Sequence, residues 1–440
     1  MVLKHLALAV FLALALGTRA AGAEPLGVEK AQIWKADSAT TVIFVEDHRA
    51  PLVEIRLVFP QGKWSPWMRR VPRVADLFEL QNMDPNGLLR GRGDRLGADV
   101  VLMSDARLSE LSLGCRKPDL DSVADLARAI LTNRDLDRRE IRRQALQKKF
   151  EWSASEKDPN FVRWQAALRT LFAPGDPRRD QYEPPPRSSG DYDLLVAMRD
   201  TLVRLPGRVI GLAGDLTRGE AEGLASGLLP VALASARASS APNLPPIVEA
   251  PARPREKTIR LDHLTQAYLA LSRDAPGLDD PDYPAFSIAN QVLAGNYLES
   301  RLYQAVRLKS GDVYGAGANH ITEAGPNVYA IVASTRASNG PSVEVKLRKA
   351  LSDLCAGGIS EQERSDAVGY MKGQRLFSLQ EPGKVLDGII RDRSRGLPPD
   401  YRASLLARQK SLTLAEINAF IRRFYDPGAF TLVRVQGVVP

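Results

Sequence analysis

The sequence has few of the residues that build disulfide scaffolds and metal clusters. Two cysteines among 440 residues exclude a disulfide-stapled fold and any Cys-rich zinc module. Only three histidines follow the first 23 residues, namely His48, His263 and His320. Such a chain has few ways to hold a transition metal. Cys115 and Cys355 lie far apart in the sequence, and we expect two buried thiols rather than a disulfide.

The chain also lacks a concentrated charge of either sign. It has 60 Lys and Arg against 52 Asp and Glu, a formal net charge of +8. Without residues 1–23, which contain Lys4, Arg19 and no acidic residue, 58 basic residues face 52 acidic ones, leaving +6 on 417 residues. This excess is too dilute for an electrostatic nucleic-acid binder. Hydrophobic residues at 44% and charged residues at 25% exclude wholesale disorder, and the length predicts two to four domains.

Long apolar runs are absent except at the N-terminus. Lys4 precedes an unbroken apolar run over 6–16, and Ala21-Gly22-Ala23 fits a small-residue cleavage site. Eleven helical residues cover about 16 Å, against about 30 Å for a membrane core, so a cleaved signal peptide is favoured over an anchor. A lipoprotein anchor would require a cysteine after this run, and the sequence has none there. We therefore predict a signal peptide over 1–23 and an exported, periplasmic protein without a membrane anchor.

A proline-rich segment over 229–256 divides the rest of the chain into two similar halves. Its six prolines, many small residues and lack of periodicity predict an extended linker. Residues 30–228 begin with strand patterns, continue through a helix, two further strands and several helices, and end with a strand and a helix. Residues 257–440 repeat the order of strands, helices, strands and long helices, and end with a strand. The sequence therefore predicts an α+β fold of two homologous domains.

Local patterns place elements within each half. Strand patterns occur at 41–46, 52–59, 100–104, 107–113, 208–213, 258–272, 312–320, 327–335 and 429–435. Helical patterns occur at 71–83, 120–131, 138–153, 161–172, 192–205, 218–228, 283–292, 297–309, 342–354 and 361–379. We expect the first two strands to pair through a turn over 47–51. Capping boxes are expected at Ser360 and at Thr413, because a glutamate, Glu363 or Glu416, lies three residues after each.

The most specific motif lies in residues 282–318, DYPAFSIANQVLAGNYLESRLYQAVRLKSGDVYGAGA. A Ser-Arg-Leu helix leads to Arg307, and Tyr314 follows seven residues later. This segment, the opening TTVIFVEDHRAPLVEIRLVFPQG and residues 357–374 resemble the pitrilysin/insulinase-type zinc metallopeptidase family, which includes the mitochondrial processing peptidases and their bacterial relatives. The resemblance covers nearly the whole chain after residue 23. It implies that each domain is a mainly antiparallel sheet packed against helices. It also implies that the two domains together form one half of a clam-shaped peptidase chamber.

The zinc motif of that family, HxxEH, is absent. In the family, two histidines four residues apart bind zinc from one helical face, and the glutamate between them is the general base. The matching helix here reads RVADLFELQNM, with Asp76 and Leu80 at the histidine positions and Glu79 at the base position. Leucine cannot bind a metal, and one carboxylate gives no zinc site of useful affinity. The later segment QALQKKFE, 144–151, offers no convincing further ligand. We therefore predict that this chain binds no metal or other cofactor and that zinc belongs to a partner subunit.

The second site of the family lies in its C-terminal domain. There an arginine and a tyrosine reach across the closed chamber, bind the substrate backbone and stabilise the charge on the scissile carbonyl; the resemblance gives these roles to Arg307 and Tyr314. One donor aimed at an oxyanion is typically worth about 3–4 kcal/mol of barrier. Leu308 and Asp312-Val313 depart from the residues usual between the pair. The alternative is an exposed arginine at a helix end and a half-buried strand tyrosine, but the kept spacing favours the functional interpretation.

Three interpretations follow. The first is the zinc-less subunit of a heterodimeric periplasmic metallopeptidase, whose HxxEH-bearing homologous partner supplies zinc and general base for cleavage of peptides. The second is a catalytically inactive pseudo-peptidase that binds peptides or scaffolds a complex. The third is an unrelated exported α+β protein.

Two surface features also carry expectations. We expect an acidic loop with Asp279, Asp280 and Asp282 to be solvated, and a basic helix over 138–149 either to be solvated or to face a partner.

Overall fold

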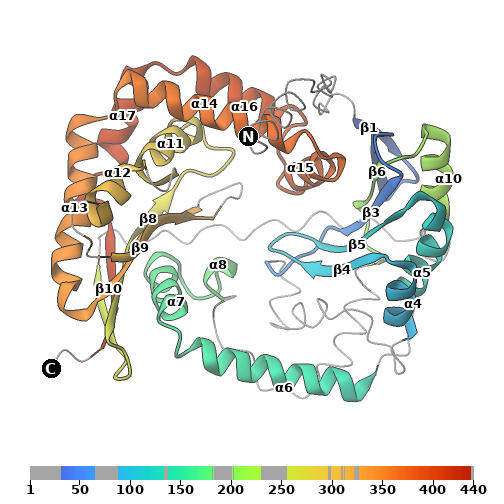
Figure 1. The fold of residues 1–440 in the computed structure, drawn as a ribbon, viewed down its shortest axis with the longest axis horizontal. Coiled ribbons are helices and arrows are strands. Elements are labelled where there is room, and N and C mark those ends of the chain that lie inside the picture. Colours follow the sequence, from blue (N-terminus) through green and yellow to red (C-terminus); the bar gives the residue numbers. More distant parts are fainter. Residues whose placement is uncertain are drawn as a thin grey trace, which may run out of the picture.

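The computed structural model places the elements of the chain in a ring-like arrangement (Figure 1). The two sheets lie on opposite sides of the ring, α14 (Glu361–Ser378) and α16 (Tyr401–Ser411) cross at one end, and α6 (Arg138–Ser155) crosses at the other. The structure describes residues 31–64, 88–132, 137–180, 182, 201, 203–228, 255–295, 299–308, 311, 313–321 and 327–437.

The N-terminal sheet has six strands in the described residues. Their order is β1 (Ala31–Lys35), β2 (Thr40–Glu46), β6 (Arg208–Gly214), β3 (Leu52–Phe59), β5 (Ser109–Arg116) and β4 (Asp99–Ser104). All neighbouring pairs are antiparallel except β2 and β6. Buried residues alternate along β3 and β4, because one face packs against a core that includes residues of α5 (Leu120–Thr132) and α10 (Arg218–Leu228). The helix α4 (Leu88–Leu96) packs beside α5.

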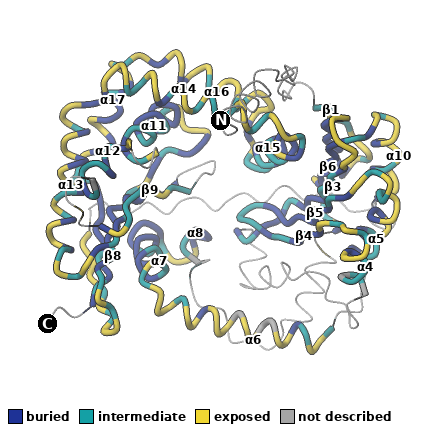
Figure 2. Tube along the Cα trace, in the orientation of Figure 1, coloured by how far each residue is buried: buried dark blue, intermediate teal, exposed yellow. Residues whose placement is uncertain are grey.

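The C-terminal sheet has five strands within the same described part. Their order is β7 (Glu256–Arg260), β11 (Thr431–Gln436), β8 (Gln266–Ala275), β10 (Asn327–Arg336) and β9 (Val313–His320). A large core covers one face with residues from α11 (Tyr283–Asn290), α12 (Arg301–Tyr303), α13 (Gly340–Gly357) and α17 (Leu414–Phe424). Figure 2 shows these buried faces, with exposed residues along most of α6.

The two sheets share one topology. Each sheet contains five equivalent strands, β2 to β6 in the first half and β7 to β11 in the second. When these strands are numbered one to five along the chain, both sheets place them side by side in the order first, fifth, second, fourth, third. In both, the first and fifth strands form the parallel pair. The predicted α+β fold of two similar halves is thereby confirmed.

Each half also contributes a helix to the sheet of the other half. The helix α15 (Pro382–Ser394), from the second half, packs on β2 and β6. The helix α7 (Pro159–Leu171), from the first half, packs on β8 and β11. The domain bounds stay a prediction, and most of the expected linker, residues 229–254, lies outside the described ranges.

Most of the local predictions agree with the structure, but the expected hairpin is wrong. β2 and β3 do not pair, because β6 lies between them, parallel to β2 and antiparallel to β3. Both capping boxes are confirmed. Cys115 and Cys355 are thiols rather than a disulfide, as expected, but only Cys115 is buried, because Cys355 lies partly exposed on α13. The expected helix over 71–83 and most of that over 192–205 lie outside the described residues. In the part of the chain that is described, no helix is long and apolar enough to cross a membrane.

Candidate functional site

The structure brings Arg307 against the start of β9. Ser300 caps α12 by accepting a hydrogen bond from the Tyr303 amide, and the helix continues as a π-helical turn, η5 (Gln304–Leu308), that carries Arg307. The Nη1 atom of Arg307 donates to the carbonyl oxygens of Val313 at 3.0 Å and Tyr314 at 2.6 Å. Arg307 and Tyr314, which the sequence predicts as a pair, are therefore in contact through the Arg307 side chain and the Tyr314 backbone carbonyl.

Tyr314 presents its side chain to solvent. Val313 is buried at the beginning of β9, and Tyr314, next along the strand, is 52% exposed. The Arg307 guanidinium carbon lies 5.9 Å from the centroid of the Tyr303 ring, which is itself buried. The phenol of Tyr314 is therefore outside the core and open to a ligand, while Tyr303 and two carbonyls position the guanidinium.

The helix that leads to Arg307 is tied to the rest of the C-terminal half by a bidentate ion pair. Arg301 donates from Nε to Glu363 Oε1 at 2.7 Å and from Nη2 to Oε2 at 2.6 Å. Glu363 also accepts from the Ser360 amide at 2.8 Å as part of the capping box of α14. Burial opposes ionisation of Glu363, but the Arg301 and Ser360 hydrogen bonds lower its pKa overall. The carboxylate thus stays charged and fixes α12 to α14.

The positions matching the zinc motif, Asp76, Glu79 and Leu80, lie outside the described residues. Among the residues that are described, no group of three or more His, Cys, Asp or Glu is arranged to hold a metal ion.

The three histidines belong to separate elements. His48 bridges two carboxylates, with Nδ1 2.6 Å from Asp215 Oδ1 and Nε2 2.9 Å from Glu46 Oε1, and these contacts, with Asp215 first, raise the pKa of the imidazole. His320 packs edge-on against Phe286 at 5.6 Å, and burial lowers its pKa. His263 lies between β7 and β8.

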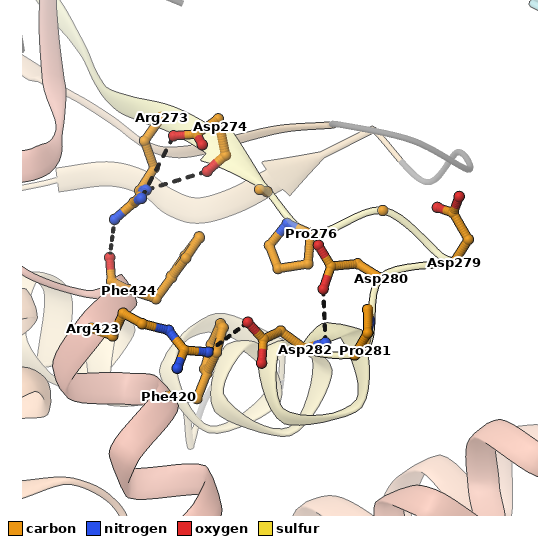
Figure 3. Close-up of a pocket in the computed structure, with 12 residues that line it drawn as sticks. Arg273, Asp274, Pro276, Asp279, Asp280, Pro281, Asp282, Phe420, Arg423 and Phe424 are labelled. Atoms are coloured by element: carbon orange, nitrogen blue, oxygen red, sulfur yellow. Dashed lines mark hydrogen bonds and ion pairs between the residues drawn. The ribbon is translucent and has the colours of Figure 1, made fainter. Parts of the chain in front are cut away.

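The acidic loop between β8 and α11 borders a cavity of about 510 Å³ (Figure 3). Asp279 and Asp280 are exposed, as expected of a solvated loop, and two of the carboxylates also make surface contacts: Asp282 pairs with Arg423 at 2.5 Å, and Asp280 accepts from the Asp282 amide at 2.8 Å. Arg273 donates to the Phe424 carbonyl and lies over that ring at 4.3 Å. These contacts close the loop onto α17.

A second cavity, on the N-terminal sheet, was not foreseen from the sequence. It has a volume of about 520 Å³ and lies against β3, β4, β5 and α15. Glu54 and Arg56, at alternate positions of β3, were the available signal, but such a pattern ordinarily indicates a solvated face.

Comparison with known proteins agrees with this architecture. Residues 192–369 match the peptidase M16 inactive domain. A segment of 157 residues is 26% identical to an uncharacterized zinc protease of Streptomyces coelicolor; it covers 36% of this chain and only 34% of that protein's length.

Two solved structures share the fold over most of the chain. The crystal structure of a peptidase M16 inactive domain from Pseudomonas fluorescens has a TM-score of 0.75 and 21% identity, covering 93% of this chain and 98% of that one. The periplasmic protease PqqL from Escherichia coli has a TM-score of 0.75 and 13% identity, covering 94% of this chain but 46% of PqqL. The match of residues 192–369 to the inactive domain and the shared fold agree with the resemblance to the pitrilysin/insulinase-type family.

Proposed function

We propose that this chain is the zinc-less subunit of a heterodimeric periplasmic metallopeptidase. The observation that carries the proposal is the hydrogen bond from the Arg307 side chain, on η5, to the backbone of the exposed Tyr314 on β9. Both residues lie inside the segment that matches the inactive domain, at the spacing expected of the substrate-binding pair. The partner is an HxxEH-bearing homologue, which supplies zinc and a general base for the activation of water.

Within such a composite site, this chain binds and orients the peptide. An arginine presents several donors in a fixed plane, so Arg307 can contact β9 through Nη1 and still direct other N–H groups at a substrate carbonyl. The Tyr314 hydroxyl, on an exposed side chain, can donate to the same oxygen as negative charge develops on it. The Arg301–Glu363 pair holds the helix during this step.

The length of the match supports a two-subunit assembly. The match covers 46% of the periplasmic protease PqqL, so one copy of this chain corresponds to about half of that molecule. A homologous partner would provide the other half. The apolar run over 6–16 and the cleavage pattern that follows it support export to the periplasm.

The second candidate is a pseudo-peptidase that binds peptides or scaffolds a complex without cleavage. One observation favours it: the Arg307 guanidinium donates to two carbonyls of its own chain, which gives this arginine a structural role that needs no substrate.

Reconstitution separates the two. Residues 24–440 are purified alone and with exported HxxEH homologues from the same source, and bound zinc and cleavage of a quenched-fluorescent peptide mixture are measured. We expect neither zinc nor cleavage from this chain alone, and cleavage on mixing. Stoichiometric zinc with activity from this chain alone would contradict the proposal, and peptide binding without cleavage in the mixture would favour the pseudo-peptidase.

The Arg307→Ala variant tests the composite site directly. We expect at least about a hundredfold lower turnover by the assembled complex, because one donor to the developing charge is lost. Lys349→Ala is the control, since it removes a positive charge from an exposed side chain of α13 whose described ion pair is with Asp353. A loss of less than about threefold for Arg307→Ala, with assembly intact, would rule out the composite site.

A further inference from the structure

The helix α6 carries a positive charge that the proposed function does not use. Its sequence, over Arg138–Ser155, contains six Lys and Arg residues and two Glu. Because a helix has 3.6 residues per turn, side chains three or four positions apart lie on one side of it. One such set, called the α6 stripe below, falls within an arc of about 120° and consists of Arg139, Arg142, Arg143, Leu146, Lys149 and Phe150. Neither glutamate belongs to the α6 stripe.

The residues of the α6 stripe are all exposed. Phe150 is 76% exposed and Leu146 is 56% exposed, and no other large hydrophobic residue in the described part of the chain exceeds the value of Phe150. These two side chains lie one turn apart and form an apolar centre. By the helical spacing, Arg142 and Lys149 lie along one side of this centre and Arg143 lies along the other. The α6 stripe therefore combines exposed apolar surface with positive charge.

Three of the four cations in the α6 stripe have no acidic partner. Arg143 pairs with Glu140 at 2.6 Å. Within the ranges that the structure describes, Arg139, Arg142 and Lys149 form no ion pair. Unpaired cations beside exposed apolar side chains attract an anionic surface.

The contacts that attach α6 to the rest of the chain lie on its other side. Ile141 is buried in the core of the N-terminal half, and Trp152 packs edge-on against Phe161 of α7 at 5.0 Å. Leu146 and Phe150 lie about 120–180° around the helix axis from Ile141 and Trp152. The α6 stripe therefore points away from this core and from α7, at the end of the ring that α6 crosses (Figure 1).

The size of the α6 stripe favours a membrane surface over a protein partner. From Arg139 to Phe150 it is about 17 Å long and about 10 Å wide, an area of about 170 Å². A stable protein–protein interface buries about 800 Å² on each partner. Association with a membrane needs no matched surface of that size, because cations at the headgroups and apolar side chains at the acyl boundary each contribute by themselves.

We propose that the α6 stripe docks on an anionic phospholipid surface. Leu146 and Phe150 enter the boundary between the headgroups and the acyl chains. The cations beside them contact lipid phosphates, with their aliphatic stems along the apolar centre. This proposal goes beyond the proposed function, because the contact needs neither zinc nor a peptide.

Vesicle binding tests the proposal. Residues 24–440 are mixed with vesicles of phosphatidylcholine alone, or of phosphatidylcholine and phosphatidylglycerol in equal amounts, and the bound fraction is measured by co-sedimentation at low and high salt. We expect at least about tenfold tighter binding to the anionic vesicles at low salt, because each cation near an anionic leaflet contributes about fivefold. High salt should reduce this difference by screening. Equal binding to both kinds of vesicle, or binding to neither, would overturn the proposal.

Two double variants locate the charge effect. Arg142→Gln with Lys149→Gln should weaken binding to the anionic vesicles about 25-fold, because two cations leave the α6 stripe. Lys349→Gln with Lys384→Gln is the matched control, since it removes the same charge from exposed side chains of α13 and α15. Equal losses in both double variants would mean that net charge alone attracts the chain, and would overturn the α6 stripe as the docking surface.

Phe150→Ser separates insertion from charge attraction. We expect about tenfold weaker binding to the anionic vesicles at both salt concentrations, because the contribution of a buried apolar side chain is not screened. Thermal unfolding should be unchanged, since Phe150 is exposed. Binding as tight as that of the wild type would overturn the insertion of this side chain and with it the proposed docking.

The outcomes are separate from those that test the proposed function. Vesicle binding is measured on this chain alone, so its failure would leave cleavage by a mixture with an HxxEH homologue unaffected. If the Arg142→Gln, Lys149→Gln variant instead weakens assembly with such a homologue, and the wild type does not bind anionic vesicles, the α6 stripe is a protein interface and the membrane proposal is overturned.

Discussion

The two helices that cross between the halves, α15 and α7, solve the same packing problem with different chemistry. α15 lies on the N-terminal sheet through four large aliphatic residues, and the close approach is made possible on the sheet side by Gly211. α7 lies on the C-terminal sheet with small residues on the helix side, such as Ala166 and Ala167. The shared topology therefore does not determine whether the sheet or the helix supplies the small residues that allow the two to pack closely.

The polar contacts at the two interfaces also differ. Around α15, ion pairs join its partly exposed rim to the sheet, as in Arg391–Asp105 and Arg56–Asp387. Under α7, the buried Arg163 donates to the carbonyls of Leu269 at 3.3 Å and Ala333 at 3.2 Å, and burial lowers its pKa to about 10. The first interface is sensitive to salt at its rim, whereas the second depends on one buried cation.

The largest effect is expected from adding a side chain at Gly211, where α15 packs directly on the sheet. A Cβ at Gly211 would lie 2.9 Å from Ile390 Cδ1 and 3.0 Å from Leu386 Cδ1. Gly211→Val should therefore lower the free energy of unfolding by about 3 kcal/mol, because α15 must move off the sheet. Urea unfolding measures this. Gly114→Ala is the control, since its nearest contact would be an ordinary 3.7 Å, and equal losses in both variants would contradict the tight approach of α15.

A smaller effect is expected under α7. Arg163→Met should lower the free energy of unfolding by about 2 kcal/mol, because two buried carbonyl oxygens lose a charged donor. Arg163→Lys should lose less, since an ammonium can still donate to one of them. Thermal and urea unfolding of the two variants give the comparison. A gain in stability for Arg163→Met would show that the buried charge costs more than its hydrogen bonds return.

The smallest effect is expected at the rim of α15. Arg391→Met removes the ion pair with Asp105, whose two side chains are 36% and 28% exposed. We expect a loss of about 0.5 kcal/mol at low salt that disappears in 1 M NaCl. A salt-independent loss would mean that the aliphatic stem of Arg391, rather than its charge, stabilises the helix.

Local patterns predicted most elements because local physics decides them. Alternation along 52–59 gave β3, and the Ser360 and Thr413 capping boxes gave the first turns of α14 and α17. The predicted hairpin failed because strand pairing is decided over long range. β6, from more than 140 residues away, pairs with both β2 and β3, and the turn over 47–51 has no pattern that reveals it.

The sequence indicates which residues to consider for the candidate site, but it does not indicate their contacts. The spacing of Arg307 and Tyr314 is a sequence property, whereas the hydrogen bonds from Arg307 to the β9 carbonyls depend on how η5 meets the strand. The cavity on the N-terminal sheet was missed for a related reason. Glu54 and Arg56 look solvated in β3 alone, and only the placement of β5 and α15 beside them makes a pocket.

The helix exchange has a consequence for how the chain can be divided. A fragment ending near residue 228 would carry α7 without β8 and β11, and would leave Ile43, Val209 and Ala213 without α15. The reciprocal fragment would expose the opposite pair of faces. Each half keeps the main core on one face of its sheet, but the other face is covered by a helix of the other half, so either fragment alone would expose buried apolar residues.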